Sequence, residues 1–407
     1  MKILYDCTEL SYFYDTNGHR AGVFYVALNL LNEFKKRGHD ITLYCDFRRY
    51  YFMKNIKEFA DFKILDSHSL LNKFIGRILY HTRKLPYTAK TAFTILSRFY
   101  DKYFYIISLK GIKKIEEFDI YLSPFTPPSV DIQKAEIPKF RMLHDIIPIL
   151  EKGMPKNTKD WHYKVYNTIS ENEFYVTNSE CTRNDVLNYF PFIKPENIKT
   201  TLLGVNENFK KIKGKIGYNI PEDKKYVFSL CTLGKRKNVI FAIRNFIKFI
   251  EKNKIKDLVL VLGGSNWKTF VAELDRTLKQ YDKSKIILTG YVKDEDLPAL
   301  YSNALMFVYP SLYEGFGLPV LEAMKCGCPV ITSNVSSLPE VIGEAGIKIN
   351  PENDNEMIEA YEKFYYDNFY RELCSERGMI RARTFTWAHC CDEILDFINE
   401  KLNQPNI

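Results

Sequence analysis

The chain has 407 residues, which exceeds what one hydrophobic core usually supports, and its 46% apolar and 15% aromatic residues suffice for two globular cores. The net charge is +8, and the nine cysteines, mostly scattered singly and without metal-ligand spacing, argue for a reducing compartment. No signal peptide precedes the first elements, and no apolar run approaches the roughly 18 residues of a membrane span, so we expect a cytoplasmic protein.

The first elements in the chain predict a Rossmann-like unit. Residues 2–6 read as a short buried strand, 17–22 as a glycine-containing loop, and 23–37 as an amphipathic helix that Gly38 ends. Residues 41–45 then return as a second strand. This order of strand, loop, helix and strand is typical of a parallel sheet with helices on its faces.

The segment 70–115 has a net charge of 10 − 1 = +9 against +8 for the whole chain, so the rest of the chain is nearly neutral. It contains ten Lys or Arg residues and a single acidic residue, Asp101. Large apolar residues alternate with these charges at helical spacing, which predicts basic amphipathic helices. Such surfaces lie on anionic membranes, although the same pattern also fits a helical subdomain that packs its apolar face on its own core. We expect no nucleic-acid partner, because no recognition motif accompanies the charge.

His144 and Asp145 follow a predicted strand, residues 140–143. The pair therefore lies at the carboxyl end of the strand, where ligands of open α/β sheets bind. A single histidine is more often structural than functional, so both interpretations remain open at this position.

The second half of the chain repeats the α/β pattern after a Lys- and Gly-rich linker, residues 210–215. A predicted strand at 225–230 leads into a loop, and a helix follows from Val239. The loop carries Arg236 and Lys237, which are either an ordinary surface pair or two cations placed to hold an anion.

A further strand, residues 286–290, is followed by Tyr291 and Val292 at its carboxyl end, where ligands of open α/β sheets bind. The acids of 294–296 have the spacing of a metal-binding D-x-D motif. They directly precede a helix, however, where acidic residues cap and charge the first turn. We expect capping here and no metal.

The most informative stretch is the loop between a buried strand, 304–309, and a helix that begins near Pro319. Gly315 and Gly317 let the backbone approach a ligand closely, because they have no Cβ. The free amides and positive dipole end of the following helix favour an anion such as a diphosphate.

Two glutamates flank this loop eight residues apart. Glu322, about one turn into the helix, has the wrong sign for phosphate and is better used to accept hydrogen bonds from ribose hydroxyls. Glu314, before the glycines, would accept from the hydroxyls of a sugar. Alternatively, both glutamates only favour the N-terminal half of a helix through its dipole.

These residues resemble a known family. Glu314-Gly-Phe-Gly-Leu-Pro-Val-Leu-Glu322 is similar to the E-x7-E signature of retaining glycosyltransferases of family 4. Residues 232–238 look like the basic loop of that family, and 288–304 look like the segment that holds the nucleotide base. With similar stretches at 336–343 and 386–387, the resemblance covers nearly all of residues 200–390.

The resemblance implies the GT-B fold: α/β, with two Rossmann-like domains facing across a cleft. The expected domains are 1–210 for the acceptor and 216–385 for the sugar nucleotide. A C-terminal helix in 386–407 would cross back to the first domain.

The resemblance also implies roles for single residues. The expected catalytic residues are His144, Asp145, Arg236, Lys237 and Glu314. Of these, His144 would contact the transferred sugar, and Asp145 would lie near the acceptor. The family often places an arginine shortly after its first glycine, whereas Val23-Phe24-Tyr25 follow Gly22 here, which leaves the acceptor contact at that point open. The expected donor-binding residues are Gly22, Tyr291, Val292, Gly315, Phe316, Gly317, Leu318 and Glu322.

The activity that the resemblance implies is retaining transfer of a hexose from a nucleotide-diphosphate sugar to a glycan or lipid-linked acceptor, in surface polysaccharide or O-antigen-type biosynthesis. The residues around His144 are similar to those of mannosyltransferases that use GDP-mannose. We expect no cofactor and no essential metal, because cations and a helix dipole balance the phosphate charge.

The expected location is cytoplasmic and peripheral, at the inner face of the plasma membrane, with 70–115 on the anionic surface. Two alternatives to transfer remain. One is another GT-B enzyme, such as a sugar-nucleotide epimerase or a phosphorylase, and the other is a non-catalytic nucleotide-sugar-binding subunit.

Overall fold

The computed structural model describes residues 1–16, 22–82, 91, 95–96, 100, 107–152, 165–212, 217–232, 234–265, 276, 279 and 282–404. The chain divides into two compact units. Unit 1 comprises Met1–Asn178, Arg183–Thr201 and Cys391–Ile407, and unit 2 comprises Ser179–Thr182 and Leu202–Cys390.

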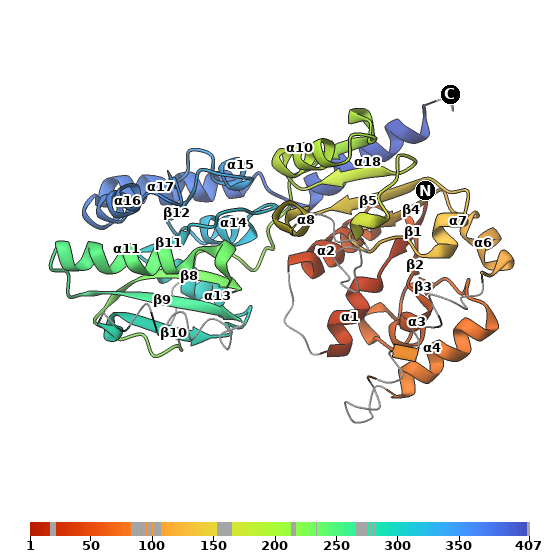
Figure 1. The fold of residues 1–407 in the computed structure, drawn as a ribbon, viewed down its shortest axis with the longest axis horizontal. Coiled ribbons are helices and arrows are strands. Elements are labelled where there is room, and N and C mark those ends of the chain that lie inside the picture. Colours follow the sequence, from red (N-terminus) through yellow and green to blue (C-terminus); the bar gives the residue numbers. More distant parts are fainter. Residues whose placement is uncertain are drawn as a thin grey trace. The chain divides into compact units, whose positions relative to one another are not determined.

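Unit 1 is built on a seven-stranded sheet in the order β3-β2-β1-β4-β5-β6-β7, whose strands all run parallel (Figure 1). The inner strand β1 lies between β2 and β4 and is buried apart from its first residue, as expected where helices cover both faces of a parallel sheet. The strands are β1 Lys2–Asp6, β2 Asp40–Tyr44, β3 Lys63–Ile64, β4 Ile120–Ser123, β5 Lys139–Leu143, β6 Phe174–Thr177 and β7 Ile198–Thr200.

The helices of unit 1 follow the prediction only in part. The helix predicted at 23–37 is confirmed as α2, Gly22–Lys36, and Gly38 ends it with a φ of 74°. The sequence prediction missed α1, Thr8–Thr16, which starts directly after β1. The other helices among the described residues are α3 Phe47–Met53, η1 Lys57–Phe59, α4 Leu70–Thr82, α6 Leu109–Ile115, α7 Val130–Lys134, α8 Ile147–Lys152, α10 Glu180–Tyr189 and η2 Pro195–Asn197. Five of the ten basic residues of 70–115, Arg83, Lys84, Lys90, Arg98 and Lys102, lie outside the described residues.

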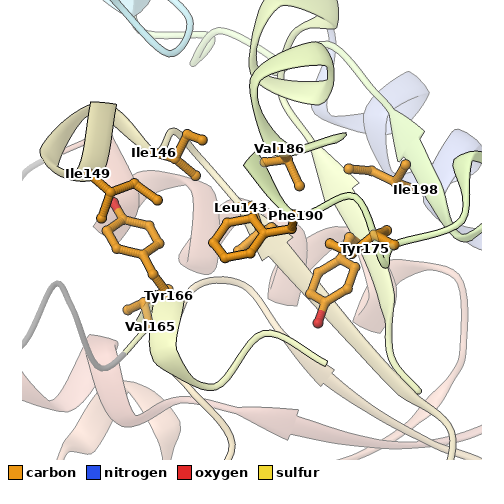
Figure 2. Packing of buried hydrophobic residues seen from close by; sticks show 10 residues of the cluster. Leu143, Ile146, Ile149, Val165, Tyr166, Tyr175, Val186, Phe190 and Ile198 are labelled. Carbon is orange, nitrogen blue, oxygen red and sulfur yellow. The ribbon is translucent and has the colours of Figure 1, made fainter. Parts of the chain in front are cut away.

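A hydrophobic core lies where β5 and β6 end (Figure 2). Leu143, the last residue of β5, packs there with Ile146 and Ile149 of the following turn and helix α8. Val186, in the last turn of α10, and Phe190, just after that helix, belong to the same cluster. This packing fixes the strand end that carries His144.

The C-terminal helix α18, Trp387–Leu402, contributes to unit 1 from Cys391 onward. Phe397 makes edge-on contacts with Phe140 and Phe174, whose rings stack with their centroids 4.9 Å apart. The hydroxyl of Thr201 donates to the carboxylate of Glu393 at 2.7 Å. The last helix therefore completes the core of the unit in which the chain begins.

Unit 2 contains a six-stranded parallel sheet in the order β10-β9-β8-β11-β12-β13. Both units are thus Rossmann-like, which confirms the predicted α/β fold class with two parallel sheets. The strands of unit 2 are β8 Lys225–Thr232, β9 Leu258–Ser265, β10 Ile286–Gly290, β11 Met306–Tyr309, β12 Val330–Ser333 and β13 Ile347–Ile349.

The helices of unit 2 include those predicted after the two loops of interest, at Val239 and near Pro319. The helices are η3 Lys235–Lys237, α11 Val239–Lys252, η4 Lys283–Lys285, α13 Leu297–Asn303, α14 Leu318–Lys325, α15 Leu338–Ile342, α16 Asp354–Tyr366 and α17 Asn368–Ala382.

Strand β5 is anchored by a buried ion pair. The guanidinium of Arg141 lies 2.8 Å from the carboxylate of Glu173, and both side chains are at least 94% buried. Arg141 also donates to the hydroxyl of Thr168 at 2.7 Å. Burial raises the pKa of Glu173 against the opposing effect of Arg141, so this carboxylate depends on its partner for its charge.

We expect Arg141→Met to lower the free energy of unfolding by about 3–5 kcal/mol, because it leaves the Glu173 carboxylate buried without a counter-charge. Urea unfolding of the full chain, followed by circular dichroism, measures the loss. The double variant Arg141→Met/Glu173→Gln also removes the unpaired carboxylate charge, so it should recover most of the lost free energy of unfolding. Equal destabilisation of the single and double variants would show that the unpaired charge does not cause the loss of stability.

Candidate functional site

The loop between β11 and α14 depends on Gly317. This residue has a φ of 119°, and a Cβ at its position would lie 2.9 Å from the side chain of Leu338. Both observations require glycine. Helix α14 begins at the next residue, Leu318, as predicted, and Pro319 contributes no amide hydrogen.

Serine hydroxyls hold the carbonyl side of this loop. Ser337 Oγ contacts the carbonyl oxygens of Glu314 and Phe316, each at 2.8 Å. The amide of Glu314 donates to Ser336 Oγ at 3.0 Å. Side-chain hydrogen bonds from the start of α15 therefore set the conformation of the loop, in place of backbone hydrogen bonds within the loop.

The carbonyl of Gly315 is held in the same way, by hydroxyls of a segment that belongs to unit 2. Ser179 Oγ lies 2.7 Å and Thr182 Oγ1 3.2 Å from it, and Ser179 also caps helix α10 by accepting from the amide of Thr182. The amides of Gly315, Phe316 and Gly317 have no hydrogen-bond partner among the residues that the structure describes. Three successive donors thus remain for an anion at the start of a helix.

Beside these amides, the carboxylate of Glu314 forms the electrostatic centre of the site. Its Oε1 lies 2.5 Å from Lys237 Nζ, and its Oε2 lies 2.9 Å from the guanidinium of Arg236. Ser311 Oγ donates to Oε1 at 2.6 Å, and the hydroxyl of Tyr309 lies 3.0 Å from the same oxygen. Glu314 is 7% exposed, so these contacts take place away from bulk water.

Burial alone would raise the pKa of Glu314, but the charges of Lys237 and Arg236 outweigh it and hold the pKa below its ordinary value. The carboxylate is therefore ionised at neutral pH. The sequence prediction treated these three residues as separate groups, with the cations on phosphate. The structure pairs both cations with one carboxylate and leaves a net charge of +1 next to the free amides.

Arg236 and Lys237 are placed by the short helix η3, which follows β8. Asn238 ends η3 with a φ of 55°, and Leu312 N donates back to the carbonyl of Arg236 at 2.8 Å. Arg236 also donates to the carbonyl of Tyr313. Two loops far apart in sequence are thus tied together at the same sheet edge.

Glu322 lies one turn into α14, apart from this ion cluster. The hydroxyl of Tyr301, on α13, donates to its Oε2 at 3.2 Å. Burial raises the pKa of Glu322 to about 8, and the hydrogen bond from Tyr301 opposes this only in part. At neutral pH this carboxyl group therefore holds a proton much of the time.

The segment predicted to meet a base follows β10. Val292 is buried, and a Cβ on Gly263 would lie 2.8 Å from its side chain, while Tyr291 is 45% exposed. The capping prediction for 294–296 is wrong in its detail. Asp296 occupies the N-cap position of α13, but its carboxylate makes no cap hydrogen bond and accepts from the hydroxyl of Tyr218 at 2.7 Å.

The remaining predicted residues belong to unit 1. His144 is buried, and its Nε2 donates to the carbonyl of Pro124 at 2.8 Å, since a carbonyl can only accept. Burial lowers the pKa of His144 to about 4, so the ring is neutral at pH 7. Asp145 Oδ1 accepts from the amide of Ile147 at 3.1 Å, at the start of α8. Gly22 is exposed at the start of α2, and residues 17–21 of its loop lie outside the described residues.

The sequence reasoning did not single out Tyr309, Ser311 and Ser337. Tyr309 and Ser311 lie in the stretch that drew attention to the site, yet a strand-end tyrosine is usually a core residue. Their role follows from the position of their hydroxyls, at the end of β11 and just beyond it, within reach of Glu314.

Residues 210–381 match the family described as glycosyl transferases group 1. This range contains Arg236, Lys237, Glu314, Glu322 and the loop that offers its amides.

Two proteins of Escherichia coli are among the relatives. The O-antigen chain mannosyltransferase B is 32% identical over 242 residues, which cover 57% of this chain and 62% of the relative. The serotype-specific mannosyltransferase WbdA is 30% identical over 266 residues, which cover 60% of this chain and 31% of the relative. The matched region thus spans less than two thirds of either relative.

Solved structures share the whole fold at low sequence identity. Anabaena Alr3699/HepE, in complex with UDP and glucose, has a TM-score of 0.67 at 14% identity, over 98% of this chain and 100% of that one. WaaG, a glycosyltransferase involved in lipopolysaccharide biosynthesis, has a TM-score of 0.63 at 14% identity, over 98% of each chain. At these identities the likeness concerns the fold.

We expect Tyr309→Phe to destabilise the protein, because it removes a hydroxyl that accepts from Lys237 Nζ at 2.7 Å and contacts the buried Glu314 carboxylate. A hydrogen bond to a charged group contributes about 1.5–3 kcal/mol, so the midpoint of thermal unfolding should fall by several degrees. Differential scanning calorimetry measures it. Tyr366→Phe, at an exposed position of α16, is the control, and an equal response of both variants would refute a special role for Tyr309.

Proposed function

We propose that this protein, whose residues 210–381 belong to the glycosyl transferases group 1 family, is a retaining hexosyltransferase that uses a nucleotide-diphosphate sugar. Its acceptor is a glycan or a lipid-linked glycan of a surface polysaccharide of the O-antigen type. The names of the two Escherichia coli relatives favour mannose as the sugar. The observation that carries the proposal is the row of free amides at Gly315, Phe316 and Gly317 beside two cations on a buried carboxylate.

This arrangement suits a diphosphate leaving group. When the bond between the anomeric carbon and the phosphate oxygen breaks, negative charge grows on the diphosphate and positive charge on the sugar ring. Amides and cations that are already in position stabilise that charge more in the transition state than in the ground state. The serine hydroxyls that bind the loop carbonyls hold the amides in an orientation in which they can donate to the same diphosphate.

Glu314 has two tasks in this proposal. It neutralises part of the charge of Lys237 and Arg236 and orients both cations. When the donor binds, the phosphates compete with Glu314 for these cations, and the carboxylate accepts from hydroxyls of the sugar. Transfer then retains the anomeric configuration, because the acceptor attacks the anomeric carbon from the same face that the diphosphate leaves.

The remaining residues keep the roles that the resemblance implied. Glu322 accepts from ribose hydroxyls, and the backbone at Tyr291 and Val292 meets the base. His144 contacts the transferred sugar as a neutral hydrogen-bonding group, because its pKa of about 4 prevents it from acting as an acid. Asp145 lies near the acceptor in this proposal.

Gly22 completes the proposed donor-binding set through close approach of its backbone. We propose that no metal or other cofactor is essential, because the cations and amides of unit 2 already oppose the phosphate charge. We propose that the enzyme acts at the cytoplasmic face of the plasma membrane. In the described part of the chain, no helix has the length and apolar character to cross a membrane.

The test is release of a nucleoside diphosphate from a panel of GDP-, UDP- and dTDP-sugars, with EDTA present and with a lipid-linked glycan supplied as acceptor. We expect release from GDP-mannose that EDTA does not reduce. Lys237→Ala should lower the rate by at least a hundredfold while nucleotide binding survives, and Lys235→Ala, the exposed neighbour, serves as control.

Each other outcome selects an alternative. Conversion of the donor to an epimer, or release that requires inorganic phosphate, would indicate an epimerase or a phosphorylase. Nucleotide binding without turnover in any combination would indicate a binding subunit. If EDTA abolishes the release of nucleoside diphosphate and a divalent cation restores it, the proposal that no metal is essential is refuted.

The raised pKa of Glu322 predicts pH-dependent donor binding. Ribose hydroxyls donate to the carboxylate form, whereas the group holds a proton below its pKa of about 8. Affinity for GDP should therefore rise by up to about tenfold per pH unit between pH 6 and 8 and level off above. Binding should also release a proton, which calorimetry in buffers of different ionisation enthalpy detects.

Glu322→Gln should abolish this dependence, and Glu359→Gln, on the exposed face of α16, should keep it. A wild-type affinity that does not change over this range, or the same profile in Glu322→Gln, would contradict the role of Glu322.

A further inference from the structure

The segment that follows β10 turns before helix α13 begins. Gly290 has a φ of 72°, so the chain leaves the strand in a conformation that favours glycine. Val292 then returns to the interior, where its side chain packs against Gly263 of β9. Thr289 Oγ1 donates to the carbonyl of Leu262, also on β9, at 3.2 Å. Packing against β9 therefore fixes the beginning of this segment.

The backbone of Val292 remains available although the residue is buried. Neither its amide nor its carbonyl has a hydrogen-bond partner among the residues that the structure describes. Buried backbone groups are nearly always paired, so two open groups on one buried residue indicate that a ligand supplies their partners.

The direction of the Val292 carbonyl depends on the next amide, that of Lys293. The two groups belong to one planar peptide unit, and in a trans peptide they point in opposite directions. The amide of Lys293 donates to the hydroxyl oxygen of Tyr218 at 3.3 Å. The Val292 carbonyl therefore points away from Tyr218.

Tyr218 comes from a different part of the chain, shortly before β8, and its hydroxyl holds the segment at two points. Besides accepting from Lys293, it donates to Asp296 Oδ2 at 2.7 Å. Burial and this hydrogen bond raise the pKa of Tyr218, so the hydroxyl keeps its proton and remains a donor. One hydroxyl thus joins the middle of the segment to the residue that precedes α13.

The same segment acts on the carboxyl group that we propose for the ribose. Burial is the main cause of the raised pKa of Glu322, and the negative charge of Asp294 adds to it. Tyr301, on the helix that follows the segment, donates to Glu322 at 3.2 Å. A displacement of residues 291–296 would therefore disturb the proposed contacts with both the base and the ribose.

We propose that Tyr218 is a positioning residue for recognition of the nucleotide base. It fixes the peptide between Val292 and Lys293, so that the Val292 carbonyl accepts a hydrogen bond from a ring N–H of the base. Guanine, uracil and thymine carry such an N–H on their pairing edge, whereas adenine and cytosine carry none. The proposal rests on the proposed function, in which the backbone at Tyr291 and Val292 meets the base, and it names the residue that orients this backbone.

The test is calorimetric titration of the full chain with GDP, UDP, ADP and CDP, and with inorganic pyrophosphate, which has the phosphates without a base. EDTA is present throughout. The wild type should bind GDP or UDP about tenfold or more tightly than ADP and CDP. Tyr218→Phe should weaken binding of the preferred nucleotide by about five- to tenfold, the effect of one lost hydrogen bond, and should leave the affinity for pyrophosphate unchanged.

A matched control removes an equivalent hydroxyl elsewhere in unit 2. Tyr365 donates to Asp257 Oδ1 at 2.7 Å, the same distance that joins Tyr218 to Asp296. Tyr365→Phe should leave all the affinities as they are in the wild type. Both tyrosines are partly exposed, so both variants should fold, which thermal unfolding verifies. If Tyr218→Phe weakens nucleotides and pyrophosphate by the same factor, its role is only structural and the proposal is overturned.

Asp296 provides a second test of the same contact. Asp296→Asn keeps an oxygen that accepts from Tyr218, so it should retain the preference for the favoured base, whereas Asp296→Ala should reduce this preference as Tyr218→Phe does. The double variant Tyr218→Phe/Asp296→Ala should lose little more than either single variant, because both side chains act through one hydrogen bond. Fully additive losses would contradict this coupling.

The two proposals fail in different ways. A wild type that binds neither nucleotides nor pyrophosphate would overturn the proposed function together with the role of Tyr218. Equal affinity of the wild type for all four nucleotides, or an unchanged preference in Tyr218→Phe, would overturn the role of Tyr218 alone.

Discussion

The site depends on one buried carboxylate that is shared by two cations. Glu314 would be costly to bury alone, and Lys237 and Arg236 would repel each other without it. Their mutual dependence ties the loop after β8 to the loop after β11. Removing Glu314 would leave two cations side by side without a counter-charge, and removing either cation would leave Glu314 with a single partner, so the cluster acts as a unit. A ligand that brings its own negative charge can exchange with Glu314 without changing the sign of any protein group.

The second requirement is a loop whose amides stay available. Successive backbone amides normally find hydrogen-bond acceptors within a helix or a sheet. Here the carbonyl groups are held by Ser337, Ser179 and Thr182, which leaves the amides of Gly315 and Phe316 without a partner among the described residues. The ion cluster and the amides together create a local positive field that neither a lysine nor a helix terminus would produce alone.

The sequence predicted what depends on local pattern and missed what depends on tertiary position. The parallel strands and the helices after Asn238 and Gly317 follow from apolar runs, glycines and caps, and the structure confirms them. The short helix α1 was missed because its sequence shows no strong apolar periodicity. The pairing of Glu314 with both cations could not be read from a linear pattern, since 77 residues separate it from Lys237.

The cluster of Phe140, Phe174 and Phe397 has a consequence for how the chain folds during synthesis. Phe397 leaves the ribosome last of the three, more than two hundred residues after Phe174. At typical translation rates this is a delay on the order of ten seconds or more. During that interval all of unit 2 is made, while the strands that carry Phe140 and Phe174 lack the helix that covers them. The domain that begins first is therefore completed last, and its uncovered aromatic surface must be protected until the final helix arrives.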